Sequence, residues 1–272
     1  MMDFFTLVES SFRGYRKNLS LIVPHLVENV LNFLFLILFV ITIFLSLGVS
    51  LSSLYSLAPP NFNLSFSMVA ILLFCILCMI FLFLIVDSCR RASTIYMAKE
   101  VFETGKTNLS AGFKGFKSFW FQIFLYLLIL VVFFFAAIAL PMIFAYSRNN
   151  FLAIFFLVFL LLSFSFFHFF TLFTPQEIVI RGCNTLDGIV ESFRFVKSNF
   201  LNVVLYCLFV FLFYFAFAIL SIFFINASEF LMALFNLIFI ILNIAAPPYF
   251  EVLKTYMVSF SRLKTGACSR RN

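Results

Sequence analysis

Six long apolar stretches constrain this chain more than any other feature of its sequence. They cover residues 21–50, 66–86, 119–146, 151–174, 200–225 and 229–250. An α-helix rises 1.5 Å per residue, so about 20 apolar residues cross the roughly 30 Å hydrocarbon core of a bilayer. Only 11% of the residues are charged, whereas a soluble domain carries about a quarter. We therefore expect an all-α integral membrane protein with six transmembrane helices, in a single membrane domain over residues 1–272.

The basic residues indicate how these helices are oriented. Among the 18 lysines and arginines, Arg148 alone falls on one side of the expected spans. The others lie at the N-terminus, in the connections 87–118 and 175–199, or after the sixth span. Connections rich in Lys and Arg stay in the cytoplasm. The sequence thus predicts a multi-pass protein of the cell membrane with both termini cytoplasmic.

Charge and cysteine usage indicate which partners to expect. The net charge of +7 suits the anionic headgroups of membrane lipids on the cytoplasmic face, and a membrane protein is a further candidate partner. Nucleic acid is not expected, because no soluble domain is large enough to bind it. Cys75 and Cys78 have the spacing of a redox or metal pair, but they lie within a span, where cysteine acts as a small apolar residue. We predict no disulfide, metal or cofactor.

An internal repeat links the two long connections. Residues 100–117 align without gaps to residues 177–194, and the matched pairs are Glu100/Glu177, Gly105/Gly182, Leu109/Leu186, Phe116/Phe193 and Lys117/Arg194. The N-terminus joins the alignment through Phe5, Phe12 and Arg13, and Glu251 takes the place of Glu100 after the sixth span. We expect three units, about 1–104, 105–181 and 182–272, each an amphipathic cytoplasmic helix followed by two spans. Since each unit contains an even number of spans, the units are parallel repeats.

The segment LDGIVESFRFVKSNF, residues 186–200, shows the character of the helix that opens each unit. Its apolar residues recur every three or four positions, and its charged residues take the opposite face. Such a helix can lie among the headgroups, with its apolar face toward the bilayer and its bases toward anionic lipid. The candidate headgroup contacts are Arg13, Arg16, Lys17, Lys114, Lys117, Arg194 and Lys197. The alternative is that these helices only cover the ends of the bundle.

The order of Glu, Gly and Leu, followed by SFRFVKSN and a span, resembles a prokaryotic family of multi-span membrane proteins. It is similar to the membrane domain attached to some glycerophosphoryl diester phosphodiesterases, and to stand-alone relatives of unknown function. In the fused proteins the resemblance implies that a separate soluble barrel carries the catalysis. This chain has no room for a barrel, and its two histidines, His25 and His168, fall in or beside spans. The resemblance therefore carries over no catalytic residue.

The first span contains the best candidate for a polar site inside the membrane. Four polar residues follow Pro24 at offsets that place them along one helical face: His25, Glu28, Asn29 and Asn32. Ionisable residues in a span are costly and mark functional sites by default. Two interpretations stay open, namely a structural contact between helices and a transport or catalytic role.

Two adjacent prolines mark the end of the last span. Pro247 and Pro248 each lack a backbone N–H, and a proline ring obstructs the preceding helical turn. We expect them to kink or end the sixth helix at the membrane interface.

No signature of an enzyme is present in the sequence. A glycine-rich phosphate loop, His-Glu-x-x-His and Gly-x-Ser-x-Gly are all missing. We expect a non-enzymatic multi-pass protein that organises the membrane, interacts with lipid or acts as a scaffold. A transporter or permease component with a polar site near Glu28 is the first alternative, and an intramembrane lipid-modifying enzyme is the second.

Overall fold

The computed structural model describes residues 3–46, 66–146, 150–224 and 229–265, and every regular element in these ranges is a helix. The elements are α1 (Phe4–Lys17), the 3₁₀ turn η1 (Leu19–Ile22), α2 (Val23–Ser46), α4 (Phe66–Thr104), α5 (Leu109–Tyr146), α6 (Asn150–Thr171), α7 (Thr174–Arg181), α8 (Thr185–Ser198), α9 (Phe200–Phe224) and α10 (Glu229–Thr265). Six of them, α2, α4, α5, α6, α9 and α10, are long and apolar enough to cross a membrane, in agreement with the six expected spans. Residues 47–50 and 225 of the expected spans, and Arg148, lie outside the described residues.

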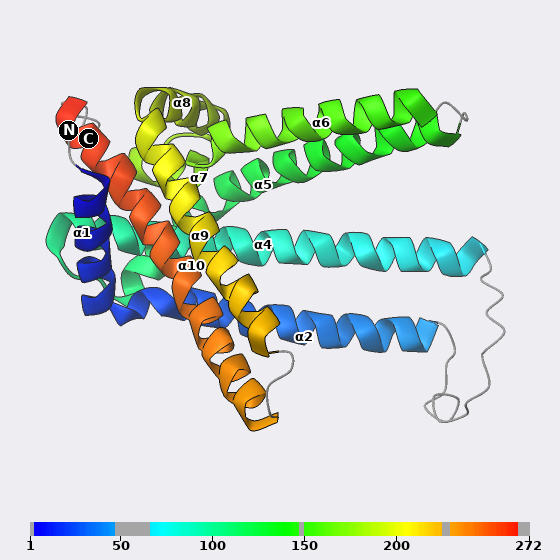
Figure 1. Ribbon diagram of the computed structural model, residues 1–272, viewed down its shortest axis with the longest axis horizontal. Coiled ribbons are helices and arrows are strands. Elements are labelled where there is room, and N and C mark those ends of the chain that lie inside the picture. The colour runs from blue at the N-terminus through cyan, green and yellow to red at the C-terminus, as the bar shows by residue number, and fades with distance from the viewer. Residues whose placement is uncertain (1–2, 47–65, 147–149, 225–228, 266–272) are drawn as a thin grey trace.

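The helices pack together at one end of the molecule, which we call the polar end (Figure 1). It comprises residues 3–28, 87–127, 171–206 and 246–265, and these ranges contain nearly all the buried side chains. From this end, α2, α4 and the hairpin of α5 and α6 extend in one direction, while α9 and α10 cross them obliquely. The short helix α1 lies at the polar end, crosswise to α2 and α4 and beside the end of α10.

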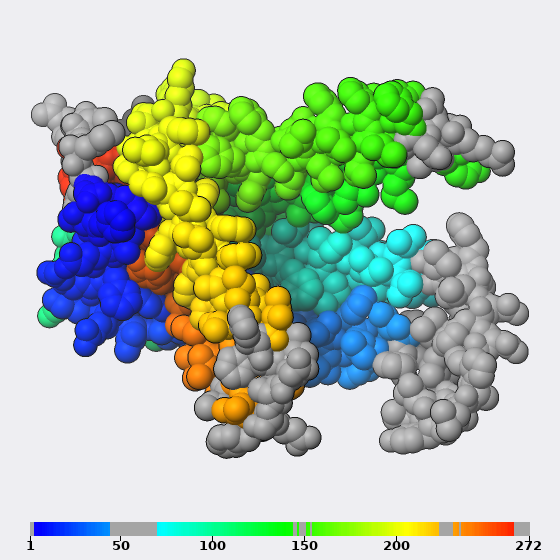
Figure 2. Space-filling model, viewed as in Figure 1, coloured from blue at the N-terminus to red at the C-terminus, as the bar shows by residue number. Residues whose placement is uncertain are grey.

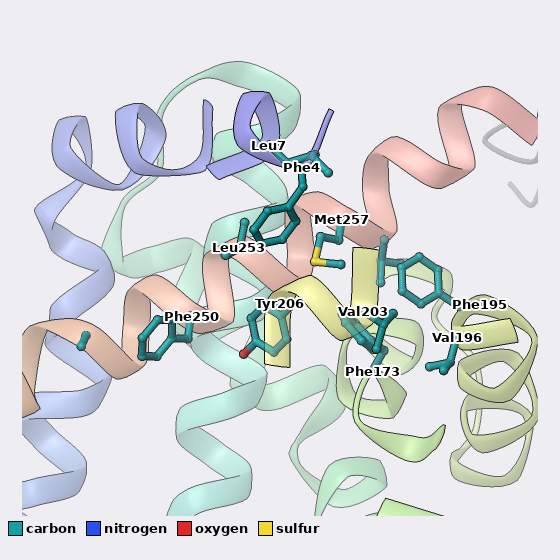
Figure 3. Close-up of a cluster of buried hydrophobic side chains, with 12 residues drawn as sticks. Phe4, Leu7, Phe173, Phe195, Val196, Val203, Tyr206, Phe250, Leu253 and Met257 are labelled. Carbon is teal, nitrogen blue, oxygen red and sulfur yellow. The ribbon is translucent and has the colours of Figure 1, made fainter. Parts of the chain in front are cut away.

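The first and last helices of the chain share one hydrophobic core. Phe4 and Leu7 of α1 pack with Phe250, Leu253 and Met257 of α10 (Figure 3). Side chains from α7, α8 and α9 complete this cluster, among them Phe173, Phe195, Val196, Val203 and Tyr206. The core therefore joins the first and last helices at the polar end.

Away from the polar end, the helices expose their apolar side chains. Phe74 of α4 is 68% exposed and Phe151 of α6 is 79% exposed. The far part of the α5–α6 hairpin stands apart from α4 (Figure 2). Exposed apolar surface on this scale marks a surface that contacts lipid or another protein.

The second connection differs from its predicted form because its amphipathic segment is not a separate helix. Helix α4 continues to Thr104, and α5 runs unbroken from Leu109 to Tyr146, so no separate amphipathic helix precedes the third span. Gly112 and Gly115, near the start of α5, do not interrupt the helix. Because they lack side chains, they let α5 approach α4 closely. A Cβ atom on Gly115 would lie only 2.3 Å from Cβ of Tyr96.

Of the two outcomes expected at Pro247 and Pro248, a kink or an end of the last helix, the structure contradicts the end. Helix α10 continues through both prolines to Thr265. The segment after them is deeply buried: Val252, Leu253 and Val258 have no exposed surface. Burial of this segment stabilises the helix by more than the missing proline N–H groups cost.

The fourth span ends in a break that α8 closes. Helix α6 stops at Thr171 and α7 begins at Thr174. Ser192 of α8 satisfies the interrupted backbone, because its Oγ accepts a hydrogen bond from N of Phe173 at 3.2 Å and donates to O of Phe170 at 2.8 Å. The side chain that bridges the break belongs to the segment 186–200, for which the sequence left open a position among the headgroups and a position over the end of the bundle.

Candidate functional site

Arg90 of α4 is the centre of a buried polar network at the polar end. Its Nε lies 2.6 Å from Oε2 of Glu28 in α2, and its Nη1 lies 3.1 Å from Nε2 of His25. Asp87, one turn earlier in α4, also accepts a hydrogen bond from Arg90. Both His25 and Arg90 are buried, and their contacts join α2 to α4.

Arg91 extends the network to α7 and α10. Its Nε donates to Oδ2 of Asp87 at 2.9 Å, and its Nη1 donates to Oε1 of Glu251 at 3.3 Å. Lys254 donates to the same Oε1 atom at 3.0 Å, and Nε2 of Gln176 donates to Oε2 at 2.6 Å. The carboxylate of Glu251 therefore holds three helices together.

The charges of this network balance. It contains three carboxylates and three cations: Glu28, Asp87 and Glu251 against Arg90, Arg91 and Lys254. Buried charges are tolerated when each is paired and hydrogen-bonded, and removing one partner leaves a costly unpaired charge. The arrangement fits a clamp between helices, because a site for a charged substrate needs a charge that the protein itself leaves uncompensated.

The structure brings together part of the polar face predicted on the first span. His25 and Glu28 belong to the network, with 3.9 Å between Nδ1 and Oε2. Asn32 is half-buried, and its Oδ1 has no hydrogen-bond partner among the described residues. Asn29 is exposed. The polar face is therefore narrower than the spacing predicts and runs through positions 25, 28 and 32.

A pocket of about 480 Å³ borders this network between α2, α4 and α5. Glu28 and Arg90 form part of its wall together with Cys89 and Ser93, and most of the remaining lining is apolar. The Glu28–Arg90 ion pair is therefore reachable from a space large enough for a small ligand.

A second ion-pair group joins α7, α8 and α10. Glu177 has no exposed surface and pairs with Arg262 of α10 and, at 3.3 Å, with Arg181. Arg181 also pairs with Glu191 of α8. Gly182 follows with φ of 66°, a left-handed conformation that ends α7 without strain.

The corresponding residues at the end of α4 make different contacts. Glu100 is half-buried and accepts a hydrogen bond from Oγ1 of Thr107 at 2.5 Å. Gly105 has φ of 78°. Asn18, which follows α1, donates to O of Gly105 at 3.3 Å and accepts from N of Thr107 at 3.1 Å. Among the three aligned glutamates, only Glu177 and Glu251 are fully buried.

All seven candidate headgroup residues are exposed at the polar end: Arg13, Arg16, Lys17, Lys114, Lys117, Arg194 and Lys197. Two of them form exposed ion pairs within their own helices, Arg13 with Glu9 at 2.7 Å and Arg194 with Glu191 at 2.8 Å. Lys114 lies 5.8 Å from the centre of the Tyr96 ring. Exposed pairs of this kind contribute little to stability, so these bases are available to an external partner.

Tyr15 fastens α1 to the rest of the polar end. Its hydroxyl donates to O of Ala245 in α10 at 2.8 Å. Burial raises the pKa of Tyr15 to about 12, because the charged phenolate loses its hydration there. This contact explains why α1 lies along α10 rather than free in solvent.

Sequence reasoning missed most of the buried network. Asp87, Arg90, Arg91, Gln176 and Lys254 were not predicted as site residues, and the arginines were interpreted only as determinants of orientation. One signal was present, because Asp87 precedes the arginines by three and four residues, the spacing of ion pairs on one helix. The partners on other helices leave no such pattern.

The comparisons with known proteins give one match. The model of a family described as a domain of unknown function (DUF7847) matches residues 103–260. No curated protein and no solved structure matches the chain. The matched region runs from the end of α4 into α10 and includes both fully buried glutamates, Glu177 and Glu251. Because the match covers more than half of the 272 residues, the chain belongs to the DUF7847 family.

Proposed function

We propose that the protein is a non-enzymatic multi-pass protein of the cell membrane that gathers anionic lipid around its polar end, which faces the cytoplasm with both termini. The observation that carries this proposal is the exposure of all seven candidate headgroup residues at one end of the molecule. A lysine or arginine near an anionic membrane surface contributes about 1 kcal/mol of attraction. Several such residues acting together favour anionic over neutral lipid.

Exposed apolar side chains accompany these bases on the same helices. On α1, Phe5 is 75% exposed and Phe12 is 53% exposed, and both lie on the helical stripe that carries Arg16. On α8, Leu186 is 69% exposed and shares a stripe with Lys197. A helix with large apolar residues and bases side by side suits the membrane interface. The crosswise position of α1 relative to α2 and α4 is the position that an interfacial helix takes (Figure 1).

Burial at equivalent positions supports the proposal that the chain consists of three parallel units. The sequence alignment places Ser11, Gly115 and Ser192 at one position, and all three are buried. A small residue there lets each helix approach its neighbour closely. In this proposal the amphipathic segment opens each unit, and in the second unit it is continuous with the span that follows.

The proposal includes kinship with the membrane domain of the glycerophosphoryl diester phosphodiesterases. In the fused proteins of that family a separate soluble barrel, attached to the membrane domain, carries the catalysis. The proposed role also includes a membrane protein partner at the polar end, beside the anionic lipid.

Lipid enrichment in nanodiscs tests the lipid-gathering role. The full chain is incorporated into nanodiscs of mixed phosphatidylcholine and phosphatidylglycerol, and the lipid content is measured by mass spectrometry against empty discs. We expect phosphatidylglycerol to be enriched by the wild type. Enrichment is lost when six bases are replaced by glutamine: Arg13, Arg16, Lys114, Lys117, Arg194 and Lys197. The matched control exchanges Arg for Lys and Lys for Arg at the same positions, which retains the charge. Equal enrichment by the neutralised and charge-retaining proteins contradicts the proposal.

A transporter or permease component is the second candidate function. The observation that favours it is the pocket of about 480 Å³ whose wall includes Glu28 and Arg90. The balanced charges of the network favour the structural role instead. Cys89 in the pocket wall gives a direct test. It is studied in a variant that keeps Cys89 and replaces the other five cysteines by alanine. Labelling of Cys89 by a membrane-impermeant maleimide from both sides of a proteoliposome supports alternating access, and labelling from one side or neither counts against it.

A further inference from the structure

A groove of about 410 Å³ runs along α1 at the polar end, on the side away from Phe5 and Phe12. Its walls come from α1, from the end of α4 and from the end of α10. It is separate from the pocket beside Glu28, with which it shares no lining residue. The groove belongs to neither the buried ion-pair network nor the apolar surface of the spans.

The α1 side of this groove is polar and carries net positive charge. Arg13 and Lys17 provide two cations, and Thr6 and Ser10 provide hydroxyl groups. Glu9 at the edge pairs with Arg13 at 2.7 Å and offsets one of the two charges. Lys17 has no acidic partner within the described part of the chain, so the groove presents one uncompensated cation.

The floor of the groove contains a buried tyrosine whose hydroxyl group is unused. Tyr256 of α10 is 6% exposed, and its ring packs edge-on against Phe102, with ring centres 5.1 Å apart. Its hydroxyl makes no hydrogen bond to any residue that the structure describes. Gly14 leaves the space that the hydroxyl needs, since a Cβ atom there would lie 2.3 Å from the Tyr256 oxygen.

An unsatisfied donor, an uncompensated lysine and a neighbouring arginine together form a site for an oxyanion. The hydroxyl of Tyr256 lines the groove and bonds no described residue, so a phosphate oxygen there can accept its hydrogen bond in place of water. Arginine and lysine beside a hydroxyl donor are the groups that hold phosphate through charge-assisted hydrogen bonds. The aromatic floor leaves no opposing charge beneath the bound group.

We propose that this groove binds one phosphate group, held by Lys17, Arg13 and the hydroxyl of Tyr256. The phosphate belongs either to a phospholipid headgroup or to a soluble phosphate. The inference deepens the proposed function, on which it rests for the orientation of the polar end toward the headgroups. It differs in kind from general lipid gathering, because it names a single saturable site that depends on a hydroxyl group.

Binding to the purified full chain in an uncharged detergent tests the site. The melting temperature is followed during titration with inorganic phosphate, with dioctanoyl phosphatidylglycerol, and with dioctanoylglycerol, which lacks the phosphate. We expect saturable stabilisation by one or both phosphate compounds and none by dioctanoylglycerol. Stabilisation by inorganic phosphate indicates a soluble ligand, and stabilisation by the lipid alone indicates a headgroup.

Two variants examine the residues that hold the phosphate. Tyr256→Phe keeps the ring and its packing and removes only the hydroxyl, and Lys17→Gln removes an exposed charge. Hydrogen bonds to a charged group are strong, so we expect each substitution to raise the dissociation constant for the phosphate compound about tenfold. Tyr96→Phe, which removes a tyrosine hydroxyl on the α4 face toward α5, is the matched control and binds like the wild type.

The outcomes separate this inference from the proposed function. It is overturned if the wild type binds neither phosphate compound, if dioctanoylglycerol stabilises equally, or if both variants bind like the wild type. Tyr256→Phe leaves the net charge unchanged, so its enrichment of phosphatidylglycerol in nanodiscs equals that of the wild type if only general lipid gathering occurs. The six-base variant also lacks Arg13 of the proposed phosphate site, so that site is judged on Tyr256→Phe and Lys17→Gln, which keep all six of those bases, and each proposal fails by its own measurement.

Discussion

Arg91 of α4 and Glu251 of α10 meet with 3.3 Å between Nη1 and Oε1, although 160 residues separate them in the chain. Lys254 and Gln176 bind the same carboxylate. Because Arg91 also donates to Asp87, the contact continues into the network around Arg90 and Glu28. The polar end is thus held by charged groups as well as by the hydrophobic core of Figure 3.

We predict that Glu251→Ala strongly destabilises the protein. The substitution leaves Arg91 without one of its two carboxylate partners and Lys254 without the carboxylate that pairs with it, and breaking a buried pair costs about 3–5 kcal/mol. Thermal unfolding in detergent, followed by the fluorescence of Trp120, measures the effect. Glu9→Ala is the control, because the exposed pair of Glu9 with Arg13 contributes about 1 kcal/mol or less. Equal melting temperatures for the two variants contradict the clamp.

Ser192→Ala should loosen the junction between α6 and α7. It removes the acceptor for N of Phe173 and the donor to O of Phe170, and an unsatisfied buried backbone group costs about 1–3 kcal/mol. Hydrogen exchange measured by mass spectrometry is expected to rise across residues 170–176. The control Ser198→Ala affects an exposed serine and should leave this region protected. Unchanged exchange in Ser192→Ala shows that the bridge is dispensable.

Alkaline pH is expected to weaken the attachment of α1. Burial raises the pKa of Tyr15 from 10.0 to about 12, so the folded state binds this proton more tightly than the unfolded state does. The resulting stability is fully present below pH 10 and is lost as the pH rises toward 12. The tyrosinate absorbance of the wild type minus that of Tyr15→Phe should titrate with a midpoint near 12. A midpoint at the ordinary value shows that Tyr15 is open to solvent.

Gly115→Ala is predicted to push α5 away from α4. The new Cβ would lie 2.3 Å from Cβ of Tyr96 and 2.8 Å from O of Ala92, and one of these is backbone that cannot rotate aside. Overpacking of this kind costs about 1–3 kcal/mol. Melting temperature reports the loss, with the exposed Ser118→Ala as the control. A variant as stable as the wild type shows that the two helices can separate without cost.

Part of the candidate site follows from the sequence. His25 and Glu28 are polar residues inside an apolar run, and the structure places both in the buried network. The exposure of bases such as Arg13 and Lys197 agrees with the polar faces that their spacing predicts. Asn29 is exposed and lies outside the network, because α2 meets α4 along positions 25, 28 and 32, and the spacing alone does not locate that line of contact.

The boundaries of the helices were harder to predict than their number. Hydropathy alone places the end of the second span where charges begin, at Asp87, although the later Glu100 and Gly105 indicate a longer helix; α4 does continue to Thr104, where Arg90 and Arg91 find buried partners. The prolines at 247 and 248 suggest an end, yet α10 continues because the residues after them are buried in the core. In both cases tertiary contacts outweigh a local signal.

Hydropathy by itself determined that this chain forms six long apolar helices, because the cost of exposing apolar residues to water adds up along the chain and needs no knowledge of neighbours. The tertiary structure decided which charges pair, which glycines allow close packing and which tyrosine keeps an unused hydroxyl. These properties depend on the distance between Arg91 and Glu251 and on the distance between Gly14 and Tyr256. Both pairs are far apart in the sequence, and only folding brings their members together. A charge in a sequence has many possible partners, and the folded chain selects among them by geometry.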